Sequence, residues 1–375
     1  MPARQFSAPT EHHQCIVTGA GVLGLAAAWS LSRRGLEVLV VDRHAPGHAR
    51  SGSKGSARIF RLSYPDPFYV EMAADAATRW RALETDSGRP LLHQRGQVNF
   101  GRSLPELADA MTRAGASFDR LSAEAGKERF PNLNIDGPSL FEAGAGVLVA
   151  DRCLQALCDT GSFEVRAGAG VRLVRDDGDL VTIILETGES LSADIAVNCA
   201  GQNATLLMDG LRAPVAALPS RQQVVYLEPA RADPVIPSFI EWADDMIYGL
   251  PLIGQDRLKL SHHTPGPTVI ADDDLLEDDA IGVDRLLQAA KRLLPTFAPQ
   301  PVATECCVYD NTVDTDFIID RVGRVVIGCG TSGHGFKFAP LLGELMADLA
   351  TGIEPRFGLG RFASDRSVLR LLPKP

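Results

Sequence analysis

The sequence has few cysteines, a deficit of positive charge and no long apolar run. Its 375 residues include seven cysteines, an odd number without ladder spacing, which argues against a disulfide framework and is typical of a reducing compartment. The formal net charge of −10 disfavours nucleic acid and anionic membranes as partners. Since no apolar run is long enough to cross a bilayer, no membrane partner is expected.

The N-terminal stretch MPARQFSAPTEHHQ lacks the hydrophobic core of a secretory signal and is expected to be a short disordered leader. A cytoplasmic location is the corresponding expectation. Hydrophobic residues make up 45% of a chain that is longer than a single core usually grows. The sequence therefore predicts a globular protein with two domains or one large α/β unit.

The segment CIVTGAGVLGLAAAWSLSRRGLEVLVVDR predicts a βαβ unit, with strands over 15–18 and 37–42 and a helix over 22–34. It contains G-x-G-x-x-G, whose glycines allow a tight turn, a close approach to a pyrophosphate and close packing of helix on strand. Free N–H groups at the helix start attract phosphates, and an acid at the end of the second strand can accept ribose hydroxyls. The predicted dinucleotide-binding residues are Gly19, Ala20, Gly21, Val22, Leu23, Gly24, Asp42 and Arg43.

The motif does not separate NAD from FAD. A second strand over 193–198 ends in the small residues Cys199-Ala200-Gly201, which suit a place where backbone runs close to a ligand. Many FAD-dependent oxidoreductases have such an element, so it favours FAD weakly.

Alternating apolar patterns such as GQVNFG, RQQVVYLE and RLKLSHH predict an antiparallel sheet with one covered face. The acidic run 271–280 predicts a solvated loop and a helix start. The expected fold is a Rossmann-like α/β FAD-binding domain with a discontinuous α+β second domain on an antiparallel sheet. The expected ranges are 1–90, 147–220 and 304–375 for the first domain and 91–146 and 221–303 for the second.

Two adjacent cysteines, Cys306 and Cys307, lie in TECCVYDN. A disulfide between neighbours would need a distorted peptide, and no companion metal ligands lie nearby in the sequence. On an extended strand the two side chains point to opposite faces. From the residues alone, both are small buried hydrophobes or one is a functional thiol.

Five segments recur in one order along the chain: TGAGVLGLAAAWSL, GSARIFRLSY, YGLPLIGQDRLKLSHH, CVYDNTVDTDFIID and GTSGHGFKFAPLLGELMADLATG. Together they resemble the monomeric sarcosine oxidase and N-methyltryptophan oxidase family of FAD-dependent amine oxidases, within the D-amino-acid-oxidase-like superfamily. The resemblance covers nearly the whole chain, and SGHGFKF is its most specific part. It implies a monomeric oxidase that converts the C–N bond of a secondary, N-methyl or cyclic amino acid to an imine and reduces molecular oxygen to hydrogen peroxide.

The resemblance also implies that FAD is covalently attached through its 8α-methyl group to Cys307, in the pattern Cys307-Val308-Tyr309 before Phe-Ile-Ile-Asp. Cys306 would then point away from the flavin, and Tyr309 would border the substrate cavity. The loop that begins the last long helix would hold the flavin, with the helix dipole favouring the anionic N1–C2=O region of the reduced ring. Its implied cofactor-binding residues are Gly333, His334, Gly335, Phe336 and Lys337.

For the substrate, the resemblance places Arg58 near the flavin ring, on a turn or short helix, and makes Arg61 and Lys337 the partners of the substrate carboxylate. An arginine can fork onto both oxygens while a lysine adds a point charge. Tyr248 and His263 would line the cavity. On its own, His263 would be interpreted as a hydrogen-bonded structural histidine, and its spacing four residues after Lys259 makes the functional interpretation about equally good.

Lys259 alternates with two leucines along a predicted strand, so it points away from them, and an inward lysine is costly unless it has a task. In the family, such a lysine contacts the flavin N5 edge through water and stabilises superoxide as it forms. Departures from the family pattern are Lys54, where a histidine is common, and Cys329, which replaces a small residue. Two alternatives remain: a dehydrogenase with another electron acceptor, and a non-catalytic flavin-carrying subunit.

Overall fold

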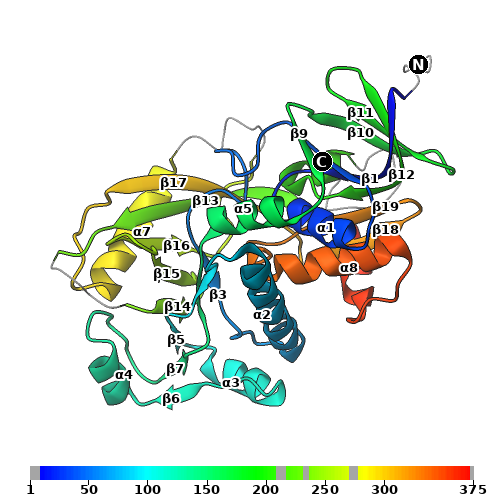
Figure 1. Ribbon diagram of the computed structural model, residues 1–375. Coiled ribbons are helices and arrows are strands. Elements are labelled where there is room, and N and C mark those ends of the chain that lie inside the picture. The colour runs from blue at the N-terminus through cyan, green and yellow to red at the C-terminus, as the bar shows by residue number, and fades with distance from the viewer. Residues whose placement is uncertain (1–8, 208–216, 231–235, 270–277, 372–375) are drawn as a thin grey trace. The chain divides into compact units, whose positions relative to one another are not determined.

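The computed structural model describes residues 9–207, 217–230, 236–269 and 278–371 (Figure 1). Most of the expected leader and most of the acidic run 271–280 lie outside these ranges. In the described part of the chain, no helix is both long enough and apolar enough to span a bilayer. The chain divides into two compact units, one formed by residues 1–54, 154–219 and 309–375 and the other by 55–153 and 220–308.

These units begin and end at other residues than the ranges expected from the sequence. The second unit already starts at residue 55, because β3 (Arg58–Phe60) pairs with β8 (Gly146–Leu148) and not with the dinucleotide strands. Arg58 therefore begins a strand, where a turn or short helix was expected. The pairing of Ile59 with Val147 gives this segment its extended form.

The first unit contains a sheet whose central strands run parallel in the order β9-β2-β1-β12. Strand β12 pairs along its first half with β11 and along its second half with β19. Helices α1 and α8 pack on one another, and a Cβ on Gly343 of α8 would lie 2.5 Å from the Ala26 carbonyl of α1. The strands are β1 (Glu11–Thr18), β2 (Val38–Asp42), β9 (Glu164–Ala167), β10 (Val171–Asp176), β11 (Val181–Leu185), β12 (Ser190–Asn198), β18 (Ile318–Val322) and β19 (Val325–Cys329), and the helices are α1 (Val22–Arg33), α6 (Ala204–Leu207) and α8 (Ala339–Thr351).

The predicted βαβ unit is confirmed as β1-α1-β2, although β1 starts at Glu11, four residues earlier than expected from the apolar pattern. The predicted strand before Cys199 is confirmed as β12. Short 3-10 helices follow at η1 (Gly201–Asn203), η4 (Phe336–Phe338), η5 (Leu359–Phe362) and η6 (Ser367–Leu371).

The second unit is built on an eight-stranded sheet in the order β17-β13-β16-β15-β14-β5-β7-β6. Strands β13, β16, β15 and β14 are antiparallel in turn, whereas β14 and β5 run parallel. A small sheet, β3-β8-β4, accompanies it. The remaining elements are β4 (Leu92–His93), β5 (Gln97–Gly101), β6 (Asp119–Leu121), β7 (Ser139–Glu142), β13 (Leu218–Leu227), β14 (Ser238–Trp242), β15 (Ile247–Pro251), β16 (Leu258–His262), β17 (Ala303–Asn311), α2 (Pro67–Ser87), α3 (Leu104–Arg113), α4 (Ala123–Arg129) and α7 (Ala280–Leu293). Helix α5 (Ala150–Thr160) begins in the second unit and ends in the first.

Both faces of this large sheet are covered, which corrects the expectation of one covered face. One face carries apolar residues such as Val225, Leu258 and Leu260, which form a core with helix α7. The opposite face carries Asn99 and Lys259, which are also buried. The small sheet and helix α3 supply apolar residues that pack against this second face. Alternation along a strand shows two faces but does not show how many of them are covered.

Candidate active site

The glycine-rich turn in the first unit has the close backbone contacts that a dinucleotide loop requires. Gly19 has φ +99°, and a Cβ there would collide with the Cys199 carbonyl. A Cβ on Gly24 would in turn collide with the Gly19 carbonyl. The small-residue turn after β12 therefore packs directly on the glycine turn, which explains why both are built from small residues.

Asp42 at the end of β2 holds this turn in place. Its carboxylate accepts from the Ala20 N–H at 2.7 Å and from the His44 N–H at 2.8 Å. A carboxylate has about four lone-pair positions, so it keeps capacity for two ribose hydroxyls. The Val22 N–H at the start of α1 donates to the Ser53 hydroxyl at 2.9 Å, which can itself donate onward to a phosphate. These residues fit FAD.

Arg43, which follows Asp42, has an acidic partner in the first unit. Its guanidinium pairs with Glu186, and Nε lies 3.2 Å from Oε2. Val22, Leu23 and Gly24 are buried in the first turn of α1, as the motif predicts. The two departures from the family pattern also lie in this unit. Lys54 directly follows Ser53 and is the last residue of the unit's first segment. Cys329 is fully buried at the end of β19, and burial raises the pKa of its thiol.

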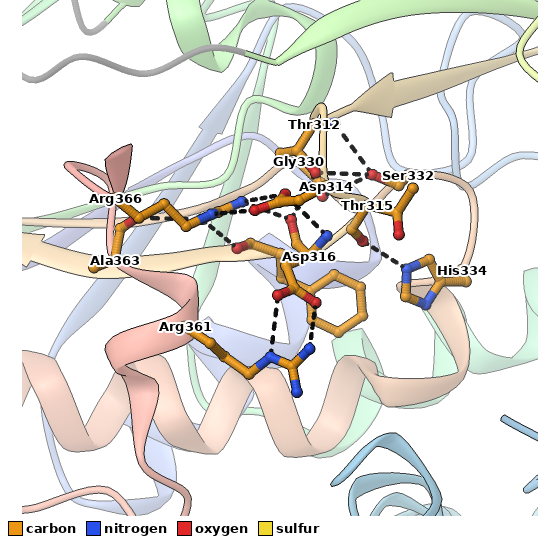
Figure 2. Close-up of polar contacts among 11 residues, drawn as sticks. Thr312, Asp314, Thr315, Asp316, Gly330, Ser332, His334, Arg361, Ala363 and Arg366 are labelled. Carbon is orange, nitrogen blue, oxygen red and sulfur yellow. Dashed lines mark hydrogen bonds and ion pairs between the residues drawn. The ribbon is translucent and has the colours of Figure 1, made fainter. Parts of the chain in front are cut away.

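The segment 330–338, between β19 and α8, forms the second part of the first unit's candidate site (Figure 2). Gly333 has φ +75°, and a Cβ there would overlap the Tyr309 ring. Gly335 caps η4, which leads directly into α8. The Lys337 ammonium donates to the His334 carbonyl at 3.0 Å and is buried. Tyr309, Gly333, His334, Gly335, Phe336 and Lys337 are thus brought together in one unit.

Two neighbours fix the ring of His334. Its Nε2 lies 3.0 Å from the Thr315 carbonyl, and its ring packs at 4.7 Å on Phe317. Because a carbonyl only accepts, Nε2 carries the proton. Behind this loop, Asp310 accepts from the Thr331 N–H at 3.0 Å and from its hydroxyl at 2.5 Å. Burial raises the pKa of the Asp310 carboxyl, although the Thr331 hydrogen bonds oppose the rise.

In the second unit, Lys259 of β16 is only 3% exposed. It lies opposite Tyr226 of β13 and Leu250 of β15 in the sheet register. Among the residues that the structure describes, none forms a hydrogen bond or ion pair with its ammonium group. A cationic side chain that is buried along most of its length and has no protein partner at its Nζ offers a donor for a ligand on this face of the sheet.

The two adjacent cysteines of β17 lie in different surroundings. The Cys306 Sγ is 3.2 Å from the Gln223 Oε1. Gln223 precedes Val224 on β13 and shares the strand face of Val225, which belongs to the core with α7. Cys307 is buried and lies close enough to Tyr226 for its charge to affect that phenol. Cys307 is therefore the cysteine on the Lys259 face of the sheet.

A cluster of polar residues lies near Cys307. The Tyr226 hydroxyl donates to the Glu305 carboxylate at 2.5 Å. Burial, followed by the Glu305 charge, raises the pKa of the Tyr226 phenol, whereas the Arg58 charge opposes the rise. Arg58 also donates to the Ala57 carbonyl at 2.9 Å. Arg58, Tyr226, Glu305 and Cys307 thus form one neighbourhood within the second unit.

Arg61, just past β3, is 7% exposed, and its guanidinium lies over two aromatic rings. It is 4.0 Å from the Tyr64 centroid and 5.4 Å from that of Trp242, and Nη1 donates to the Ser63 carbonyl. Burial raises the pKa of Tyr64 to about 12, so this phenol stays neutral near pH 7. In the described part of the chain, no carboxylate forms an ion pair with Arg61. Arg61 also forms a side-chain hydrogen bond with Tyr64, and its other N–H donors are available to an anionic ligand.

Tyr248 and His263 occupy the same region of the second unit. Tyr248 of β15 pairs with Ser261 of β16 and packs among the apolar residues of the Lys259 face. His263 follows the end of β16 and is half-buried. Its backbone N–H donates to the Met246 carbonyl at 2.8 Å. The register brings Tyr248 and Lys259 to one face of one sheet.

The buried residues that support Arg61 could not be recognised in the sequence. Glu142 accepts from the N–H groups of Leu62 at 2.8 Å and Ser63 at 3.2 Å, and from the Asn99 amide at 3.1 Å. The Trp242 indole donates to the Asn99 Oδ1 at 3.1 Å. The available signal was the glutamate that follows Leu140 and Phe141 at the end of the stretch SLFE.

Three known proteins are similar to this chain over most of its length. The chain is 29% identical to monomeric sarcosine oxidase of Bacillus sp. (strain NS-129), over 96% of this chain and 98% of that protein. It is 30% identical to N-methyl-L-tryptophan oxidase of Salmonella heidelberg (strain SL476), over 94% and 99%. The open form of NikD, an amino acid oxidase of nikkomycin biosynthesis, superposes with a TM-score of 0.83 at 24% identity, covering 94% of this chain and 98% of that one.

The resemblance and the fold class inferred from the sequence are confirmed by these comparisons. Residues 14–349 match the family described as FAD dependent oxidoreductase (DAO), which is most of the chain. The chain therefore belongs to the DAO family of FAD-dependent oxidoreductases.

Proposed function

We propose that this protein is an oxidase of a secondary, N-methyl or cyclic amino acid. Bound FAD would supply the two-electron chemistry by which a C–N bond becomes an imine and molecular oxygen becomes hydrogen peroxide. The named relatives are oxidases of N-methylated amino acids, which supports this substrate class. The monomeric state and the cytoplasmic location expected from the sequence belong to the same proposal.

The buried guanidinium of Arg61 carries the proposal. Because Tyr64 and Trp242 cover it and no described carboxylate forms an ion pair with it, an anionic ligand would supply the direct charge partner that this guanidinium lacks. A substrate carboxylate is the simplest such anion, and the fork of an arginine matches its two oxygens. Lys337 is proposed as a second carboxylate partner.

Lys259 has a separate part in the proposal. Its ammonium group, which has no partner among the described residues, would favour the reduction of oxygen by stabilising negative charge as it develops, which is electrostatic catalysis. Arg58, near Cys307, is proposed to lie beside the flavin ring, and Cys307 to be its covalent attachment point. Tyr248 and His263 would line the substrate cavity.

An oxygen-consumption assay tests the proposal directly. Sarcosine, other N-methyl amino acids, proline and pipecolate would each be compared with the matching amine that lacks the carboxylate. At least one amino acid should consume oxygen and form an equal amount of hydrogen peroxide, while its decarboxylated partner is a poor substrate. Substrate-dependent reduction of an artificial acceptor without oxygen consumption would instead identify a dehydrogenase.

A further inference from the structure

Two arginines of the C-terminal segment bind the turn between β17 and β18 (Figure 2). Arg366 donates from Nε and Nη2 to the Asp314 carboxylate at 2.7 and 2.9 Å. Arg361 donates from Nε and Nη2 to the Asp316 carboxylate at 3.1 and 2.9 Å. Both are two-bond contacts of a guanidinium with a carboxylate, which add geometric specificity as well as energy.

Arg366 also binds the backbone of this turn. Its Nη2 donates to the Asp316 carbonyl at 3.0 Å and its Nη1 to the Phe317 carbonyl at 3.0 Å. The Thr312 hydroxyl donates to the same Asp316 carbonyl at 2.7 Å. The turn 312–316 is therefore held from outside by the C-terminal segment and from inside by its own hydroxyl.

The turn in its bound shape contacts the segment 330–338. The Thr315 carbonyl accepts from His334 Nε2, and the Thr312 and Ser332 hydroxyls lie 3.2 Å apart. Thr315 has φ +61° and Ser332 φ +48°, and these are the non-glycine residues with positive φ in the part of the chain that the structure describes. Such backbone conformations persist only where the surroundings impose them, and they cluster at functional sites.

We propose that Arg361 and Arg366 are positioning residues for the cofactor loop. Through the turn 312–316 they fix His334, and with it Gly335 and the start of α8. The inference rests on the proposed function and on the expectation from the sequence that residues 333–337 hold the flavin ring. Without these arginines, the turn would no longer hold the N-terminus of α8 in place. The helix dipole would then stabilise the anionic N1–C2=O region of reduced flavin less.

The alternative is that these arginines only stabilise the fold, and the first unit contains a matched control for that role. Arg34, at the end of α1, donates to the Asp348 carboxylate of α8 at 2.6 Å in a similarly part-buried pair. It has no hydrogen bond or ion pair with the described residues 312–317. Arg34→Gln should therefore lower thermal stability without changing the flavin.

The experiment measures the two-electron midpoint potential and the visible spectrum of the flavin-loaded protein, together with its melting temperature. Arg366→Gln and Arg361→Gln should each reduce the equilibrium constant for flavin reduction about tenfold, a potential about 30 mV lower. Arg34→Gln should keep the wild-type potential. If Arg366→Gln does not fold, Arg361→Gln, which replaces the more exposed arginine, still tests the proposal. Arginine variants with a lower melting temperature but an unchanged flavin spectrum and midpoint potential would overturn the proposal.

Two variants within the loop separate this inference from the function on which it rests. Lys337→Met and Gly335→Ala change the residues proposed to face the flavin. If neither shifts the potential, the loop does not contact the flavin and the proposed cofactor placement fails as well. If they shift it while the Arg361 and Arg366 variants do not, only the positioning role fails.

Discussion

Arg61 and Glu142, both in the part of the chain that the structure describes, are buried in one cluster but form no ion pair with each other. Glu142 instead accepts from the N–H groups of Leu62 and Ser63 and so holds the backbone that follows Arg61. A direct pair would neutralise the guanidinium and compete with any carboxylate ligand. The arrangement keeps the cation fixed and available.

Arg61→Ala should weaken binding of simple carboxylate inhibitors. Hydrogen bonds to charged groups contribute about 1.5–3 kcal/mol, and about 1.4 kcal/mol is a tenfold change in affinity. We therefore expect the dissociation constant, measured by perturbation of the flavin spectrum, to rise roughly ten- to a hundredfold. Arg129, which lies 3.9 Å from the centroid of the Phe141 ring, supplies the control. Arg129→Ala should leave the constant unchanged, and an equal effect of both changes would contradict the assignment.

Lys259→Met should slow the reaction of the reduced enzyme with oxygen. Loss of a preorganised charge typically costs about a hundred- to a thousandfold in rate. Stopped-flow measurement of flavin reoxidation should show a loss of that order, whereas anaerobic reduction by substrate should change far less. Comparable damage to both half-reactions would place Lys259 in substrate binding.

The parts of the site that could be predicted from the sequence are those made by contiguous residues. The βαβ unit from β1 to Asp42 could be predicted because its turn, helix and acid follow one another at fixed spacing. The network of Glu142 and Asn99 could not, because it depends on which distant strands pair and on a second layer over the sheet. Arg361 and Arg366 lie in a segment without apolar periodicity, so nothing local indicated that they bind the turn 312–316.

Cys307→Ala should abolish covalent attachment of FAD, whereas Cys306→Ala should preserve it. The two thiols are neighbours of equal chemistry, but Cys306 contacts Gln223 and Cys307 lies beside Tyr226. In acid-precipitated protein, the wild type and the Cys306 variant should retain the yellow flavin in the pellet. Flavin released from the wild-type pellet into the supernatant would show that the cofactor is not covalently bound.

Asp310→Asn should remove one pH-dependent contribution to stability. Burial raises the pKa of the native Asp310 carboxyl, whereas an aspartate in an unfolded chain ionises near pH 3.9. Between these two values the native state holds a proton that the unfolded chain has released, so the native state is favoured at low pH. Its contribution to the free energy of unfolding then falls as the pH rises towards the native pKa.

Urea unfolding at a series of pH values from about 4 upwards measures this contribution. An asparagine keeps an oxygen that can accept from the Thr331 N–H and hydroxyl, as Asp310 Oδ1 does, but it does not titrate. The free energy of unfolding of the wild type minus that of the variant should therefore decline with rising pH and level off above the native pKa. A difference that grows with pH would mean that the native state prefers the ionised carboxylate, so that the Thr331 hydrogen bonds outweigh burial.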